Sequence, residues 1–300
     1  MYNLDELKSG KYGEYLVAEP MKNHTTFKVG GPCDLLIMPE TELQIVGIVK
    51  YCSTNSIPFM VIGNGSNLLV TDKGIRGVII KLGKNYSEIS FDGNKVYAQA
   101  GALLSTVAKK SFKHSLTGME QISGIPGSIG GAMVMNAGAY GGEISFVTCK
   151  VRCVTQEGEI VEFEKDEMEF GYRESVVSKR NLIVLDVVLN LEEGDMDEIM
   201  AAFEDYDNRR TTKQPLDRYS AGSTFKRPVG GYASKLIDDS GLRGFSYKRA
   251  QVSEKHCGFV INTSDATYEE VITLIHQIQN IVKEKFDIQL ETEVKIIGEE

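Results

Sequence analysis

The sequence predicts an α+β fold built from three blocks, and the order of its patterns is the reason. Residues 35–70 show a strand, a helix and a strand, whereas residues 147–191 contain a succession of strand patterns. The last third of the chain adds two long amphipathic helix patterns. A chain of 300 residues is long enough for two or three domains. We therefore expect domains at 1–82, 83–194 and 195–300.

The first block is expected to begin with the strand Leu35–Met38, which follows a Gly-Gly-Pro turn. Thr41 and Gln44 have the spacing of a capping box, which predicts the start of a helix. The apolar stripe of this helix is expected to consist of Leu43, Val46, Val49 and Cys52.

A buried strand over residues 58–62 is predicted to run directly into the loop Gly63-Asn-Gly-Ser-Asn67, and the strand Leu68–Val70 follows. Sheets with α/β topology bind ligands at the carboxyl ends of their strands, where loop N–H groups can turn toward a phosphate. A simple turn explains this loop about as well.

The middle of the chain is predicted to be rich in strands. A turn at Asp92-Gly93-Asn94 is typical of a hairpin, and a helical spacing of apolar residues follows it. The expected strands are Gly77–Lys81, Ile89–Phe91, Val96–Gln99, Val147–Val154, Ile160–Phe163 and Leu182–Leu191, and the helix carries Leu103, Leu104, Val107, Ala108 and Phe112.

The C-terminal block is expected to contain two helices and a final strand. Asp195–Arg210 is amphipathic, and Thr267 with Glu270 forms a capping box before the second helix. The inward side chains are expected to be Met196, Ile199, Met200, Phe203 and Tyr206 in the first helix and Val271, Leu274, Ile275, Ile278, Val282 and Phe286 in the second. The strand Val294–Ile297 is expected to end the chain.

The stretch from Gln121 to Gly142 holds seven glycines and no charged side chain. Apolar residues lie between the glycines, so a solvated linker, which would be rich in serine and charge, does not fit. Backbone without side chains can approach a large ligand closely, and its N–H groups suit phosphate. The alternative is a tight structural turn region between core elements.

Composition excludes several classes of protein. A net charge of −9 argues against a general nucleic-acid binder. The five cysteines are odd in number and form no CxxC pair, and the four histidines are scattered. We therefore expect no metal site and a reduced, cytoplasmic setting. The N-terminus lacks an apolar signal segment, and no run of 18 apolar residues predicts a membrane helix.

Three side chains are candidates for chemistry, and each has an ordinary alternative. Arg173, at a strand–loop junction, could bind a carboxylate or an enolate through its guanidinium fork, although a surface arginine is commoner. Ser223, in a small-residue turn, could donate a proton, although such serines usually bond the backbone. Glu293 could act as an acid, although it could also lie on an exposed strand face with Glu291 and Lys295.

Basic residues gather in one segment of this acidic chain. Residues 209–255 contain eleven lysines and arginines and four acidic residues. This segment therefore indicates an anionic ligand, and a solvated surface is the equally weighted alternative.

Seven motifs occur in an order that points to one family. They are VIGNGSNLLV (61–70), SGIPGSIGGA (123–132), NAGAYGGE (136–143), YRES (172–175), RTTKQP (210–215), AGSTFKRP (221–228) and LETEVKIIG (290–298). From His24 to Gly298 the chain closely resembles the UDP-N-acetylenolpyruvoylglucosamine reductases, flavoenzymes of peptidoglycan precursor synthesis often called MurB. At 300 residues it resembles the shorter type, which lacks an extra substrate-capping loop.

The resemblance implies a two-part FAD-binding domain of the vanillyl-alcohol-oxidase/p-cresol-methylhydroxylase (PCMH/VAO) type and a C-terminal α+β domain that binds the substrate. The residues it places at FAD are Gly63, Asn64, Gly65, Ser66, Asn67, Gly124, Ile125, Pro126, Gly127, Gly130, Gly131, Asn136, Ala137, Gly138 and Tyr140. The residues His24–Gly31 would add further contacts to the cofactor.

The resemblance also implies a reaction. NADPH would deliver hydride through FAD to UDP-N-acetylglucosamine enolpyruvate, giving UDP-N-acetylmuramate. Ser223 would protonate the substrate, and Arg173 would stabilise the developing enolate. Glu293 would hydrogen-bond the same group or hold the geometry. The substrate-binding residues implied are Tyr172, Lys213, Lys226 and Arg227.

Two other functions compete with this interpretation. The first is another oxidoreductase on the same flavin fold that acts on a hydroxy acid or an alcohol. The second is a non-catalytic nucleotide-binding protein, which would be colourless when purified. We expect a small-molecule enzyme that is monomeric and binds neither nucleic acid nor membrane.

Overall fold

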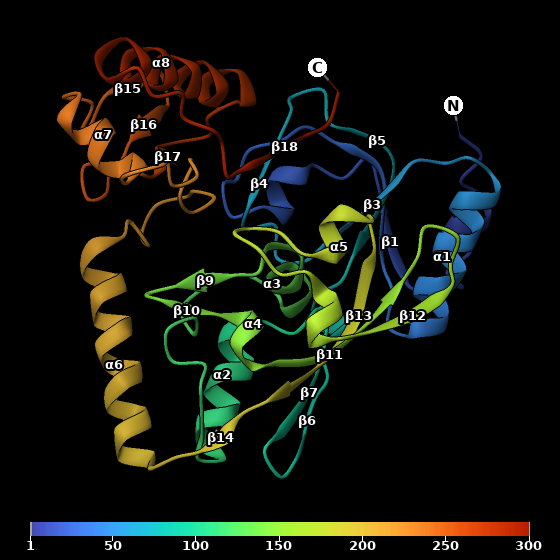
Figure 1. Cartoon of the computed structure of the whole chain (residues 1–300). Helices are drawn as coiled ribbons and strands as arrows, with labels where there is room; N and C mark the ends of the chain where they lie inside the picture. Colours follow the sequence, from blue (N-terminus) through green and yellow to red (C-terminus); the bar gives the residue numbers. More distant parts are fainter. Residues whose placement is uncertain (1, 300) are drawn as a thin grey trace. The chain divides into compact units, whose positions relative to one another are not determined.

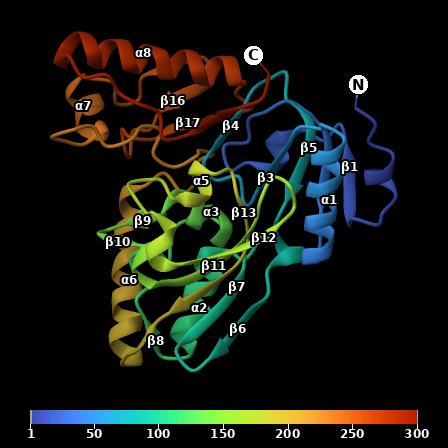
Figure 2. The same cartoon turned by 45° about the vertical axis from the view of Figure 1, so that its right-hand side comes forward.

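The computed structural model describes residues 2–299 (Figures 1 and 2). The chain folds into two compact units, and neither is continuous in sequence. Unit 1 comprises the chain up to Val17, Leu35–Asn64 and Gly77–Arg209, and unit 2 comprises Ala18–Asp34, Gly65–Arg76 and the chain from Arg210. The three-domain division expected from the sequence stays a prediction.

Unit 1 contains a four-stranded sheet with the order β1-β2-β5-β3. Its elements are β1 (Glu14–Val17), β2 (Cys33–Met38), helix α1 (Glu42–Thr54), β3 (Phe59–Ile62) and β5 (Ile75–Lys81), with the 3-10 turns η1 (Glu6–Lys8) and η3 (Lys84–Tyr86) nearby in the chain. The predicted capping box of α1 is confirmed, because Thr41 and Gln44 bond each other's backbone N–H.

The predicted stripe of α1 is partly wrong. Leu43 is 84% exposed, and Ile45 and Ile48 are fully buried together with Val49 and Cys52. Leu43 points to the opposite side of the helix from Ile45, two residues later, so the core covers a different face from the one predicted. The predicted buried strand before the GNGSN loop is half-buried except at Ile62, since β3 forms one edge of its sheet.

A five-stranded antiparallel sheet with the order β12-β11-β13-β7-β6 forms the rest of the unit 1 framework. Its strands are β6 (Ile89–Asp92), β7 (Lys95–Gln99), β11 (Thr148–Val154), β12 (Ile160–Glu164) and β13 (Ile183–Asn190). All five were predicted to within about two residues, and the hairpin turn at Asp92–Lys95 is confirmed.

Short elements and helices complete unit 1. They are α2 (Leu104–Lys113), α3 (Ile129–Met135), α4 (Ile144–Val147), α5 (Val176–Lys179), η4 (Lys165–Met168) and the strand pairs β8 (Leu116–Thr117) with β14 (Glu192–Glu193) and β9 (Gly138–Ala139) with β10 (Gly142–Glu143). Helix α6 (Met196–Lys213) begins in unit 1 and ends in unit 2. Of its predicted inward residues, Ile199 is buried, whereas Met196 and Met200 are exposed.

Unit 2 packs helix α8 against a small antiparallel sheet with the order β15-β16-β17, which both views show (Figures 1 and 2). Its elements are η2 (Met21–His24), β4 (Leu68–Val70), α7 (Ala233–Asp239), β15 (Ser246–Tyr247), β16 (Ala250–Val252), β17 (Val260–Asn262), α8 (Tyr268–Phe286) and β18 (Lys295–Ile297). The stripe predicted for α8 is buried except at Phe286, which is half-buried.

Strand β4 does not join the four-stranded sheet of unit 1. It pairs in parallel with β18, and Leu68 lies opposite Lys295. The predicted strand Leu68–Val70 is confirmed, and the sequence did not predict its partner. The reason is long-range: β18, from the C-terminus, supplies the hydrogen-bond partners that this strand needs.

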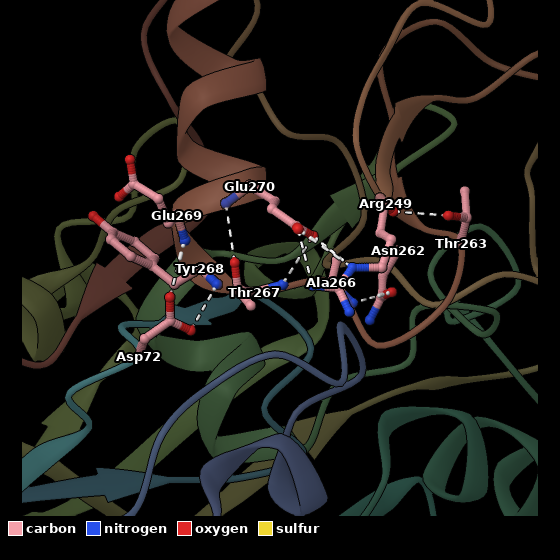
Figure 3. A network of polar contacts seen from close by, with 9 residues as sticks. All are labelled: Asp72, Arg249, Asn262, Thr263, Ala266, Thr267, Tyr268, Glu269 and Glu270. Atoms are coloured by element: carbon pink, nitrogen blue, oxygen red, sulfur yellow. Dashed lines mark hydrogen bonds and ion pairs between the residues drawn. The ribbon is translucent and has the colours of Figure 1, made fainter.

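The first turn of α8 is capped twice, as Figure 3 shows. Thr267 and Glu270 form the predicted capping box. The carboxylate of Asp72 accepts hydrogen bonds from the backbone N–H groups of Tyr268 at 2.9 Å and Glu269 at 3.2 Å. A negative charge at a helix N-terminus is favourable, so a residue close to β4 stabilises a helix almost 200 positions away.

The guanidinium of Arg249 donates hydrogen bonds of 2.9 to 3.3 Å to the buried carboxylate of Glu270 (Figure 3). These bonds favour the charged form and lower the pKa of Glu270. The network therefore joins the start of α8 to the strand region at Arg249 through a charge pair.

All five cysteines are free thiols. Among residues 2–299, no cluster of three histidine, cysteine, aspartate or glutamate side chains is arranged to hold a metal ion. None of the helices described is long and apolar enough to cross a membrane.

Candidate active site

The glycine run is folded into unit 1. Ser128 caps the start of α3, and its Oγ accepts a hydrogen bond from the N–H of Gly131 at 3.4 Å. The N–H of Gly130 donates to the carbonyl of Ala100 at 2.8 Å, and a Cβ on Gly130 would lie only 3.0 Å from the Cβ of Ala100. Glycine therefore allows this backbone to pack directly against Ala100. This contact supports the alternative interpretation of the run as a tight structural turn region.

A cavity of about 100 Å³ lies between the end of β3 and the first turn of α3. Its lining is uncharged and includes Gly63, Gly130 and Gly131. A Cβ on Gly63 would lie 2.0 Å from the Oγ of Ser128, so the GNGSN loop and the glycine run touch at this point. A hydrogen bond of 2.6 Å from Asn64 Nδ2 to the Pro126 carbonyl also joins the two glycine motifs, which are distant in sequence.

A larger surface depression of about 370 Å³ lies elsewhere in unit 1, beside Phe146, Cys149 and Lys165. It contains none of the residues singled out by the sequence. We therefore place the candidate site at the smaller cavity, where the two glycine motifs meet.

Arg173 is held against the far end of the glycine run. Its Nη2 donates to the carbonyl of Gly138 at 3.1 Å, and its guanidinium lies 5.2 Å from the centre of the Tyr172 ring. The backbone of Arg173 has a φ of 59°, a left-handed conformation that few side chains adopt without support. Such strain persists only where the surroundings fix it, and it is frequent at functional sites.

Asn136 ties the same two segments together. Its Nδ2 donates to Glu143 Oε2 at 2.8 Å and to the carbonyl of Gly171 at 3.1 Å. Asn136 also has a left-handed backbone and is buried. Asn136, a predicted cofactor residue, therefore orients the loop that carries Arg173. Glu143 holds the Asn136 side chain in place, and the sequence did not indicate this role.

In unit 2, Ser223 and Glu293 lie on adjacent segments. Phe225 and Thr292 form an antiparallel bridge, and the N–H of Glu293 donates to the carbonyl of Thr224 at 2.8 Å. Ser223 is exposed in a turn, and Glu293 is half-buried. The expectation that Glu293 shares a regular strand face with Glu291 and Lys295 is wrong, because β18 begins only at Lys295.

Thr224 anchors the Ser223 turn from below. It is buried, its N–H donates to the carbonyl of Gly258 at 2.8 Å, and its Oγ1 accepts a bond from the N–H of Val260 at 3.0 Å. Sequence patterns did not indicate this role, because a threonine beside a serine in a turn is not distinctive.

The predicted substrate-binding residues are placed at the surface. Lys226 pairs with Glu291 at 3.0 Å, and the Arg227 guanidinium lies 4.4 Å from the centre of the Tyr232 ring. Tyr172 is 51% exposed, and Lys213 is exposed at the end of α6. Lys226 and Arg227 therefore flank the Ser223 turn within unit 2.

Comparison with known proteins defines the class first. A model of the FAD binding domain matches residues 33–164, which span both glycine motifs. A model of the UDP-N-acetylenolpyruvoylglucosamine reductase C-terminal domain matches residues 214–297, which contain Ser223 and Glu293. The chain is a flavin-dependent oxidoreductase.

The relatives define the family. The UDP-N-acetylenolpyruvoylglucosamine reductase of Clostridioides difficile strain 630 is 50% identical over 284 residues, covering 95% of this chain and 93% of that protein. The enzyme of the same name from Alkaliphilus oremlandii is 52% identical over 285 residues, covering 95% and 94%. The crystal structure of the Thermus caldophilus enzyme superposes with a TM-score of 0.81 at 33% identity, covering 94% of this chain and 98% of that one.

The chain therefore belongs to the UDP-N-acetylenolpyruvoylglucosamine reductase (MurB) family. It is an FAD- and NADPH-dependent reductase of peptidoglycan precursor synthesis. The cavity fits a part of FAD: it is uncharged, lies where two backbone segments meet, and is bounded by Gly63 and Gly130, at which a Cβ would lie 2.0 Å and 3.0 Å from a neighbouring atom.

Proposed function

We propose that Ser223, Arg173 and Glu293 carry the reduction of UDP-N-acetylglucosamine enolpyruvate to UDP-N-acetylmuramate. FAD, which the two glycine motifs would hold, would supply the transfer of hydride from NADPH to the methylene carbon of the enol ether. The carbon beside the carboxylate then gains a proton, so the double bond is reduced by one hydride and one proton.

Ser223 is proposed as the source of that proton. Its hydroxyl is exposed in a turn, and the carbon it would protonate is far more basic than an alkoxide, so the transfer is downhill. The observation that supports this role is the pairing of the Ser223 turn with the segment before β18. Glu293 lies on that adjacent segment. Glu293 would bond the substrate carboxylate as its charge develops.

Arg173 is proposed to stabilise the enolate. Its guanidinium is already oriented by the Gly138 carbonyl, and its planar set of N–H donors matches a carboxylate or an enolate. A preorganised cation aimed at developing charge contributes about 3 kcal/mol to lowering the barrier.

The remaining predicted residues are proposed to bind rather than react. Tyr172, Lys213, Lys226 and Arg227 would hold the anionic sugar nucleotide, which the basic composition of residues 209–255 supports. The glycine motifs and their neighbours, including Gly65, Ser66, Gly124, Ile125, Gly127, Ala137 and Tyr140, would line the cofactor. A monomer in the cytoplasm is the proposed state, and the five free thiols support that compartment.

The substitution Ser223→Ala tests the proton donor. Anaerobic flavin reduction by NADPH should stay within about twofold, whereas flavin reoxidation by the enolpyruvyl sugar nucleotide should slow by about 10³-fold. Stopped-flow absorbance at the flavin band measures both steps on one preparation. Equal slowing of the two steps would show that Ser223 has another role.

A further inference from the structure

The GNGSN loop contains two asparagines with different partners. Asn64 ends its segment of unit 1, and its Nδ2 donates to the carbonyl of Pro126 in the glycine run at 2.6 Å. Asn67 belongs to unit 2, and its Nδ2 donates to the carbonyl of Glu293 at 3.1 Å. One short loop therefore directs one side-chain amide to the glycine run and the other to the segment that carries Glu293.

Asn67 makes two hydrogen bonds to the segment that contains Glu293. Besides the side-chain bond to Glu293, its own carbonyl accepts a hydrogen bond from the N–H of Lys295 at 2.9 Å. The parallel pairing of β4 with β18 starts at the next residue, Leu68. Asn67 thus fixes the backbone on both sides of residue 294 just before the ladder begins.

The opposite side of Glu293 is fixed by the Ser223 turn. Its N–H donates to the carbonyl of Thr224 at 2.8 Å, while its carbonyl accepts from Asn67. The direction of a Cα–Cβ bond follows from the peptide planes on either side of it. Both peptide planes that flank Glu293 are hydrogen-bonded. The two contacts therefore set the direction in which the Glu293 side chain leaves the backbone, relative to the Ser223 turn.

We infer that Asn67 is a positioning residue for Glu293, in addition to any contact that its loop makes with the cofactor. The inference rests on the role proposed above for Glu293. Without the Nδ2 donor, the Glu293 carbonyl loses this partner, and the peptide after it depends on the longer bond of 3.4 Å from the N–H of Val294 to the Thr224 carbonyl. A displacement of about 1 Å at a reacting group lowers a rate by about 10²-fold.

The experiment compares Asn67→Ala with Asn64→Ala as a matched pair in one loop. Flavin content of the purified proteins, reduction by NADPH and reoxidation by the enolpyruvyl sugar nucleotide are measured for each. In its flavin-loaded fraction, Asn67→Ala should lose about tenfold to a hundredfold more in reoxidation than it loses in reduction. Asn64→Ala should instead weaken flavin retention, because its amide bridges the two glycine motifs.

The double variant Asn67→Ala/Glu293→Gln provides the decisive readout. If Asn67 acts through Glu293, the double variant should reoxidise no more slowly than Glu293→Gln alone, because coupled residues are not additive. If the fold-loss in the reoxidation rate of the double variant equals the product of the two single fold-losses, the residues act independently and the inference is overturned. If Glu293→Gln leaves reoxidation unchanged, the proposed role of Glu293 fails, and that failure is visible without any Asn67 variant.

A second substitution covers the case in which Asn67→Ala does not fold. Asn67→Asp keeps the shape of the side chain and removes the Nδ2 donor. It should reproduce the selective loss in reoxidation. Loss of flavin from Asn67→Asp with unchanged reoxidation of the remaining holoenzyme would assign Asn67 to the cofactor alone and overturn the inference.

Discussion

Units 1 and 2 carry their candidate residues in different ways. In unit 1, Gly63 and Gly130 bound an uncharged cavity at positions where a Cβ would lie 2.0 Å from the Oγ of Ser128 or 3.0 Å from the Cβ of Ala100, and the rest of the lining is mostly valine, isoleucine and leucine. In unit 2 the candidates are side chains: Ser223 and Glu293 extend from two segments that are bonded to each other through their main chains.

The difference follows from what each part has to do. A cofactor diphosphate is bound by N–H groups, and only glycine lets the backbone come close enough to present them. Proton transfer needs one side-chain atom in one place, so its support comes from hydrogen bonds beneath it, such as those of Thr224. Substitutions at the glycines of unit 1 should therefore affect cofactor binding, and substitutions around Ser223 and α8 in unit 2 should affect chemistry or stability.

The largest effect is expected from Gly63→Ala in unit 1. The new Cβ would lie 2.0 Å from the Oγ of Ser128, and forcing extra volume into a packed site costs about 3 kcal/mol. The variant should be purified with little flavin, which the absorbance ratio of flavin to protein measures.

Gly231→Ala is the control for that substitution. A Cβ at this position meets no atom within 4 Å, and the backbone does not have a positive φ. Flavin content should be unchanged. Ser128→Ala in the Gly63→Ala background removes the struck atom and should restore part of the flavin, whereas no recovery would show that the contact is not the cause.

Glu270→Gln should have the next largest effect, on the stability of unit 2. Because Arg249 lowers the pKa of Glu270 in the folded state, the pair stabilises the fold above the unfolded pKa of about 4.3 and ceases to do so as the pH falls through the lower folded pKa. At pH 7 the variant should lose about 2 kcal/mol in free energy of unfolding.

Urea unfolding at several pH values measures this difference. The gap between wild type and Glu270→Gln should shrink as the pH is lowered below about 4. Glu269→Gln, at the exposed neighbouring position, should match wild type throughout. A gap that is constant with pH would mean that packing, and not the charge pair, accounts for the loss.

The smallest effect is expected from Asp72→Ala. It removes the acceptor for two backbone N–H groups at the start of α8 and should lower the free energy of unfolding by about 1 kcal/mol. Asp72→Asn keeps one acceptor without the charge and should fall between the two. Equal stability of all three proteins would show that water replaces the carboxylate without cost.

Local patterns in the sequence predicted much of the fold. The capping boxes at Thr41 and Thr267, the hairpin at Asp92–Lys95 and the buried stripe of α8 each depend on residues within a few positions of one another. The failures were also local patterns. Leu43 has the spacing of a core residue and is exposed, since helical periodicity gives a face but does not say which face the core covers.

The sequence alone also determined the family, because seven motifs in register leave few alternatives, and it indicated the residues for which roles are proposed. Only the tertiary structure decided how those residues are supported. Asn67 and Glu293 are 226 positions apart, and β4 pairs with a strand from the end of the chain. Hydrogen bonds within a helix or a turn join near neighbours and so leave a trace in the sequence, whereas a bond between distant segments exists only once the whole unit has folded around it.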